Sequence, residues 1–218
     1  MHCMKLLALT LATASLTSVL HAQVLEQTSF ESGQGFTLGS IDGQNGWNDF
    51  LGFDVISGNA YNGTQCVSAA TSDLSAGWAY KVFGTSPNFI NSGVLATRCF
   101  IKYNDATPAT RDDNSAFGLE AWADDGLNRF ATIMLDARGG ATIKGGQNDA
   151  PVYVSSISTP SDVYHEVLLV VDITARCAAG YVNGNLVGTV NNTTAPSLTN
   201  VSDVDLAYYA FDLYSDNF

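Results

Sequence analysis

Apolar and polar residues alternate with a period of two along much of the chain. The clearest case is the segment 94–103, where one face carries Leu95, Thr97, Cys99, Ile101 and Tyr103 and the other carries Arg98, Phe100 and Lys102. Successive side chains of a β-strand point to opposite faces of the sheet, so this alternation predicts a strand with one face in a core. A longer apolar run at 165–175 is typical of a central strand, and no window shows a sustained helical period.

Short pairs of turn-forming residues separate these strand-like runs. Asn183-Gly184 lies between two of them, which is the strongest short-range hairpin signal because both turn residues need a positive φ. Asp125-Gly126 and Gly139-Gly140 separate further runs in the same way. We therefore predict three antiparallel hairpins.

The spacing of strands and turns defines a fold class. Ten or more short strands follow one another, and the five prolines stand in loop-like surroundings. This pattern predicts an all-β fold, a two-sheet antiparallel jelly-roll sandwich. No internal repeat and no linker interrupts the chain, so we expect residues 23–218 to form one β-sandwich domain.

The first 22 residues have the composition of a secretory signal peptide. A lysine near the start is followed by an apolar run at 6–11 and then by small residues that end at Ala22. The apolar run is too short to span a bilayer. We therefore predict a secreted or cell-surface protein with no membrane span.

Composition limits the partners that the chain can have. The formal net charge is −12, which repels nucleic acid and anionic lipid. Three cysteines follow the predicted signal, namely Cys66, Cys99 and Cys177, and their spacing matches no zinc motif. An odd number leaves at least one thiol unpaired, and a Cys66–Cys99 disulfide stays open as an alternative to buried free thiols.

Three segments together resemble a known superfamily. They are the start SFESG…GW (29–47), the middle YHEVLLVVDITARCAAGYVNGNLVG (164–188) and the end DLYSDNF (212–218). They are similar to the concanavalin A-like lectin/glucanase superfamily, in the LamG-like branch of exported bacterial proteins. The resemblance implies a concanavalin A-like sandwich. Similar proteins often continue past such an end with a short C-terminal segment that sorts them to the cell surface. We therefore expect that this sequence is a truncated version of such a protein, or that the protein lacks the sorting segment.

Catalytic signals are weak. The resemblance to the glucanase branch implies a motif E-x-D-x-E on one strand, with the two outer Glu side chains as nucleophile and acid. The nearest segment here is LEAWADD, whose carboxylates have the wrong spacing. Only His165 remains after the signal, and it stands in an apolar strand, where a structural role is expected. A glycosidase with carboxylates from different strands, or a polysaccharide lyase, stays an alternative.

A polar and aromatic strand face favours carbohydrate binding instead. In GLEAW, alternation places Glu120 and Trp122 opposite an apolar face, so we expect them on an exposed sheet surface. Aromatic rings stack on sugars, and planar polar groups bind the hydroxyls. Arg98 and Lys102 share one face of their own strand, and we expect them to contribute to the same ligand-binding surface. The alternative is that Trp122 packs under a loop and the charges are solvated.

A further resemblance predicts that the protein binds a calcium ion. Several carbohydrate-binding sandwiches hold a structural Ca²⁺ between a Glu of the first strand and an Asp of the last, and Glu31 and Asp216 resemble that pair. The loop residues Asp112, Asp113 and Asn114 form a second candidate. Solvated turn carboxylates remain the alternative for both.

These observations predict a secreted, non-catalytic, lectin-like module that binds a polysaccharide or glycan. Two alternatives remain. The first is a structural or adhesive surface protein that binds a protein partner, and the second is a glycoside hydrolase or polysaccharide lyase whose site the motifs do not reveal.

Overall fold

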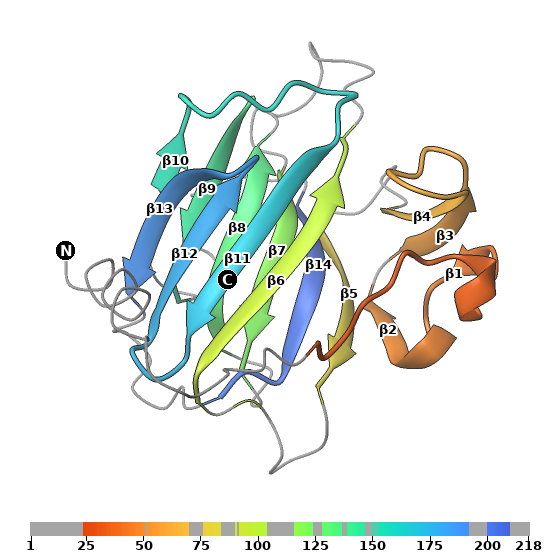
Figure 1. Ribbon diagram of the computed structural model, residues 1–218, viewed down its shortest axis with the longest axis horizontal. Coiled ribbons are helices and arrows are strands. Elements are labelled where there is room, and N and C mark those ends of the chain that lie inside the picture. The colour runs from red at the N-terminus through yellow and green to blue at the C-terminus, as the bar shows by residue number, and fades with distance from the viewer. Residues whose placement is uncertain are drawn as a thin grey trace, which may run out of the picture.

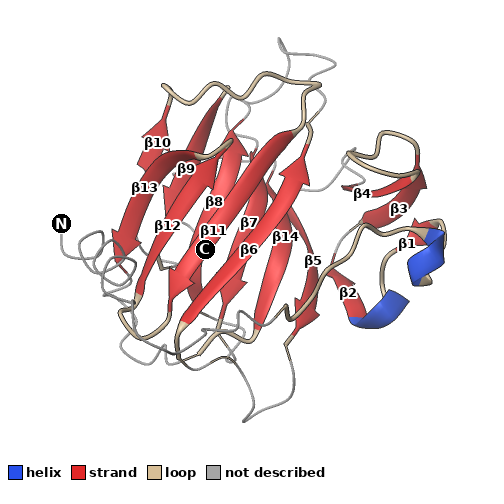
Figure 2. Ribbon diagram, in the orientation of Figure 1, coloured by secondary structure: helices blue, strands red, loops and turns tan. Residues whose placement is uncertain are grey.

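The computed structural model describes residues 24–50, 52–69, 76–83, 90, 92–103, 116–123, 128–136, 139–146, 150, 152–191 and 200–209. These residues form antiparallel β-sheets, as the alternation predicts, and the helical segments among them are two 3₁₀ turns, η1 (Ser32–Gln34) and η2 (Gln44–Gly46). Figure 2 shows that strands dominate the fold.

Two sheets face each other to make the sandwich (Figure 1). The larger has seven strands in the order β10-β9-β8-β7-β14-β5-β2. The smaller has four, in the order β13-β12-β11-β6. The seven are β2 (Trp47–Phe50), β5 (Ala76–Val82), β7 (Ala116–Trp122), β8 (Arg129–Asp136), β9 (Gly140–Lys144), β10 (Val152–Val154) and β14 (Asp203–Tyr209), and the four are β6 (Val94–Ile101), β11 (His165–Asp172), β12 (Cys177–Val182) and β13 (Asn185–Asn191).

The main core fills the space between these two sheets. Side chains on β11 alternate between buried and half-buried along its whole length. The strand lies inside its sheet, between β12 and β6, as the apolar run at 165–175 predicts. The buried members from the two sheets form one apolar cluster, which includes Leu119, Ala121, Ile133, Leu135, Val167, Leu169 and Val171. Their burial fixes which face of each strand points away from the core.

The predicted hairpins are present. Asn183 and Gly184 have φ angles of 51° and 75° between β12 and β13, and Gly139 has a φ of 86° before β9. Strands β7 and β8 also pair antiparallel, although their turn, 124–127, lies outside the described residues. Positive φ at both residues is what a two-residue hairpin of this kind requires.

His165 helps to hold the β12–β13 turn. Its Nε2 lies 2.9 Å from the Pro160 carbonyl oxygen, which can only accept, so Nε2 donates and Nδ1 accepts from the Asn183 side chain at 3.0 Å. The Asn183 Oδ1 accepts from the Glu166 backbone N–H at 3.0 Å. These contacts agree with the structural role expected for this histidine.

A third, small sheet was not predicted from the sequence. It has the order β1-β3-β4, formed by β1 (Gly39–Ser40), β3 (Phe53–Ser57) and β4 (Gln65–Ala69), and it lies beside the β5 and β2 edge of the seven-stranded sheet (Figure 1). It has its own core, with Phe36, Ile41, Phe53 and Val55 buried around Trp47. Both Cys66 on β4 and Cys99 on β6 are free thiols, so the disulfide considered above is not formed.

Candidate functional site

The outer face of the seven-stranded sheet, away from the main core, carries a row of aromatic and acidic side chains. Phe50 lies opposite Trp78 in the β2–β5 pairing, and Asp205 lies opposite Glu120 in the β14–β7 pairing. Small residues occupy the centre of this face, because Ala207 pairs with both Trp78 and Gly118. The large side chains therefore have room to extend over β14.

Trp78 shows how far these side chains extend. Its strand, β5, is separated from β7 by β14, and neighbouring strands are about 4.8 Å apart. The Trp78 Nε1 nevertheless donates to Glu120 Oε2 at 3.1 Å. The indole therefore crosses above Ala207, against which it packs.

Glu120 is the centre of the row. Its Oε2 also accepts from Trp122 Nε1 at 3.1 Å. Its Oε1 accepts from Tyr209 Oη at 2.9 Å and from Thr132 Oγ1 at 3.0 Å, and it forms an ion pair with the Arg129 guanidinium. Five donors thus converge on a carboxylate with 0% exposure. A carboxylate held in this way fixes the side chains around it.

Burial and charge set the protonation of its partners. Burial opposes the charge of the Arg129 guanidinium, but the nearby Glu120 and Tyr209 outweigh this and raise the pKa of Arg129. Burial, followed by the negative Glu120, raises the pKa of Tyr209 well above its ordinary value. Arg129 therefore stays charged, and the Tyr209 hydroxyl keeps its proton.

Two further carboxyl groups lie beside this centre, on β14. Asp205 is 6% exposed, and its Oδ1 is buried with no hydrogen-bond partner. Asp203 is half-buried and accepts from Ser202 Oγ at 2.6 Å. Burial raises the pKa of Asp203, and burial together with the negative Asp203 and Glu120 raises the pKa of Asp205 well above its ordinary value.

The structure shows where the residues of the predicted binding surface lie. Glu120 and Trp122 do lie together on the face away from the core. The expectation that this face is fully exposed is wrong for Glu120, which is buried, while Trp122 is half-buried. Four of the five converging donors come from other strands, so the strand's own sequence gives no sign of that burial.

Arg98 and Lys102 do not join this surface. Their strand, β6, belongs to the four-stranded sheet, whose outer face points the opposite way. Arg98 is 3.5 Å from Glu166, and its guanidinium lies 5.8 Å from the Phe100 ring centre, while Lys102 donates to Asn59 Oδ1 at 3.3 Å. They therefore lie around the contact between this sheet and the loop that joins β3 to β4.

That contact is aromatic. Tyr61, in the β3–β4 loop, stacks on Phe100 with ring centres 3.8 Å apart and planes 4° apart. Tyr164 meets the edge of the same Tyr61 ring at 5.3 Å, and the Lys102 ammonium lies 5.4 Å from the Tyr164 ring centre. We name Arg98, Lys102, Phe100, Tyr61 and Tyr164 the loop clasp, because they attach the small sheet to the sandwich.

Of the two residues predicted to bind calcium, Glu31 and Asp216, the structure describes only Glu31. The Glu31 Oε1 accepts from the Thr64 and Gln65 backbone N–H groups at 2.6 and 2.8 Å, and Oε2 accepts from Thr64 Oγ1 at 2.7 Å. Asp216 and the loop 112–114 lie outside the described residues, so calcium stays a prediction. Within the described part of the chain, no three His, Cys, Asp or Glu side chains come together as a metal site.

The Glu31 contacts give a prediction on stability. Hydrogen bonds from Gln65 and Thr64 lower the pKa of Glu31. A lowered pKa contributes stability that is present above the unfolded-state pKa of about 4.3 and is lost as the pH falls through the folded-state value. We expect Glu31→Gln to lower the Tm at pH 7 and to have a shrinking effect towards pH 3, as measured by thermal unfolding in circular dichroism. A Tm difference that is constant across this range would contradict the assignment.

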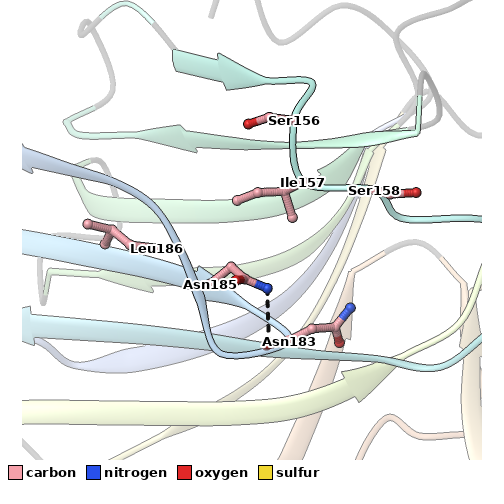
Figure 3. A pocket seen from close by; sticks show the side chains of 6 residues that line it. All are labelled: Ser156, Ile157, Ser158, Asn183, Asn185 and Leu186. Atoms are coloured by element: carbon pink, nitrogen blue, oxygen red, sulfur yellow. Dashed lines mark hydrogen bonds between the residues drawn. The ribbon is translucent and has the colours of Figure 1, made fainter.

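A separate pocket lies by the β12–β13 turn (Figure 3). Its volume is about 520 Å³, and its lining is Ser156, Ile157, Ser158, Asn183, Asn185 and Leu186. The Asn185 amide donates to the Asn183 carbonyl oxygen at 3.2 Å, and the Asn183 side chain is already bonded to His165 and Glu166. The pocket has no aromatic ring and no charged group, so we do not place the functional site there.

Sequence motifs alone did not find most of the site. Alternation in 203–209 is a signal that could have found Asp203, Asp205 and Tyr209, because it puts all three on one face of a strand. No sequence signal distinguishes Trp78 or Arg129. Their importance comes from strand order, because β14 lies between β5 and β7 although the three are far apart in the chain.

The fold and this face define a two-sheet antiparallel jelly-roll sandwich with an aromatic and acidic outer surface. No known protein family and no characterised protein matches the sequence. Among solved structures, the chain is similar to a sialidase, with 12% identity, a TM-score of 0.51 and coverage of 74% of this chain but only 13% of the sialidase. This likeness supports the fold alone.

Two further solved structures have lower TM-scores. A family 7 alginate lyase, A1-II', has 13% identity and a TM-score of 0.47, with coverage of 69% of each chain. The Crh5 transglycosylase has 16% identity and a TM-score of 0.48, with coverage of 78% of this chain and 66% of its own. Over the described residues, no helix is long and apolar enough to cross a membrane.

Proposed function

We propose that this protein is an exported, non-catalytic lectin-like module that binds a polysaccharide or glycan on the outer face of the seven-stranded sheet. The observation that carries the proposal is the row of aromatic rings arranged around the Glu120 carboxylate. Such a row combines apolar ring faces for the sugar with fixed polar groups for its hydroxyls.

Access to the row is best at its β2 end. Phe50 is 57% exposed, and its ring centre lies 5.7 Å from that of the half-buried Trp78, with an angle of 37° between the planes. Tyr209 continues the row on the other side, 5.8 Å from Trp78. Tyr209 itself is 3% exposed, so a sugar ring placed on Phe50 would next meet the half-buried Trp78 ring, against which Tyr209 packs.

Both carboxylate oxygens of Glu120 already accept hydrogen bonds from neighbouring side chains, which supports a role in binding over a role in hydrolysis. A nucleophilic carboxylate must approach the anomeric carbon of the sugar. All of the contacts of Glu120 instead hold its own neighbours, and the side chain is fully buried. Glu120 therefore holds the surrounding aromatic rings in place.

Binding of neutral and acidic polysaccharides by affinity electrophoresis tests the proposal. We expect Phe50→Ala to weaken binding about 3- to 10-fold, because one aromatic contact contributes about 0.5–1.5 kcal/mol. Tyr61→Ala is the matched control, since Tyr61 is 56% exposed but belongs to the loop clasp. Equal losses in the two variants, or a wild-type protein that binds no polysaccharide, would reject this site.

A further inference from the structure

The carboxyl groups of Asp203 and Asp205 can still form hydrogen bonds to a ligand, which the Glu120 carboxylate cannot. The carboxylate of Glu120 is occupied by five donors, whereas the buried Asp205 Oδ1 receives no donor from the row, and the Asp205 side chain is hydrogen bonded to that of Asp203. A buried polar atom without a partner costs about 1–3 kcal/mol, so its retention needs an explanation.

The strand register places the pair directly against the row. Asp203 lies opposite Trp122, and Asp205 lies between Glu120 on β7 and Tyr80 on β5. Side chains directly opposite each other in an antiparallel pair have Cβ atoms about 4.5–5.5 Å apart. A sugar that contacts the Trp122 ring would therefore have its hydroxyl groups within reach of Asp203, the more exposed of the two.

The charges around the pair favour an uncharged ligand. Within the described part of the chain, neither Asp203 nor Asp205 forms an ion pair, and the negative Glu120 faces Asp205 across the strand. The positive Arg129 also acts on Asp205, but its charge is paired with Glu120. Asp205 is buried and its side chain is hydrogen bonded to that of the half-buried Asp203, so the two carboxyls cannot both ionise cheaply and retain a proton between them. A protonated pair both donates and accepts hydrogen bonds, which suits sugar hydroxyls, while its remaining negative charge repels a carboxylate.

We propose that Asp203 and Asp205 are the hydroxyl-recognising groups of the glycan-binding face and restrict it to uncharged sugars. This inference rests on the proposed function, because it takes the aromatic row to be the binding surface. Asp203 would make the direct contact, and Asp205 would hold and orient it from beneath.

The experiment compares one neutral polysaccharide that the wild-type protein binds with its carboxymethylated derivative. We expect the wild type to bind the neutral polymer at least 10-fold more tightly. The Asp203→Asn/Asp205→Asn double variant, which keeps shape and hydrogen bonding but removes the charge, should bind the neutral polymer within about 3-fold of wild type and the charged polymer about 10-fold better, which corresponds to 1.4 kcal/mol. The Asp203→Ala/Asp205→Ala variant should lose about 10-fold on the neutral polymer.

Asp162→Asn is the matched control, because it makes the same chemical change at an exposed loop position. Thermal unfolding of every variant verifies that it is folded. The inference is wrong if the double Asn variant gains nothing on the charged polymer, or if the double Ala variant binds the neutral polymer as tightly as the wild type. Failure of the Phe50→Ala test rejects the proposed function instead, so the two failures are distinguishable.

Discussion

Glu120→Gln is expected to destabilise the protein by about 3–5 kcal/mol, because it removes the charge that a buried guanidinium requires. Arg129 is 4% exposed and pairs with a carboxylate that is 0% exposed. The amide of Gln also brings two donors into a position that already receives five. Urea unfolding followed by tryptophan fluorescence measures the change, since Trp78 and Trp122 both contact Glu120.

Glu166→Gln is the control for this prediction. Glu166 also pairs with an arginine, Arg98, but the two side chains are 36% and 63% exposed and their charged atoms lie 3.5 Å apart. An exposed pair contributes at most about 1 kcal/mol, so this variant should unfold close to the wild-type midpoint. If both variants lose the same free energy of unfolding, Glu120 is not the centre of the site.

Gly118→Ala is expected to cost about 3 kcal/mol or more, at or above the upper end for overpacking, because the added methyl group has no space. A Cβ atom at this position would lie 2.0 Å from the Ile133 carbonyl oxygen and 2.8 Å from the Met134 Cα atom. Both are backbone atoms of the neighbouring strand, so no side-chain rotation relieves the contact. The central β7–β8 pairing would have to separate, which urea unfolding would detect as a lower midpoint.

Gly33→Ala serves as the comparison. Gly33 has nothing within 4 Å of an added Cβ and does not have a positive φ. Replacing such a glycine changes stability by only about 0.4–1 kcal/mol, usually upwards, because the unfolded chain loses freedom. A Gly118 variant as stable as the Gly33 variant would show that β7 and β8 are not packed as described.

The local features of the fold were predictable because they depend on neighbours in the chain. The Asn183-Gly184 turn and the strand faces of 94–103 follow from backbone conformation and from the alternation of side chains. The small sheet was not predictable, because β1 has only two residues and pairs with β3 through a glycine-rich segment that carries no regular alternation.

The site shows the same limit more clearly. Alternation alone placed Glu120 and Trp122 on one face, but it gave no information on which sheet would receive β6. Arg98 and Lys102 were therefore assigned to the wrong surface. Trp78, Tyr209 and Arg129 meet Glu120 only because residues up to 89 positions away in the chain become neighbours in the sheet.

The position of β2 links the two parts of the molecule mechanically. Phe50 ends the edge strand of the large sheet, and β3 of the small sheet begins at Phe53, only three residues later. The loop clasp holds the other end of the small sheet, through rings and cations that are partly open to solvent. The small sheet is thus fixed at both of its ends, so release of the clasp would free only the end that lies away from Phe50 and would leave the contact between Phe50 and Trp78 in place.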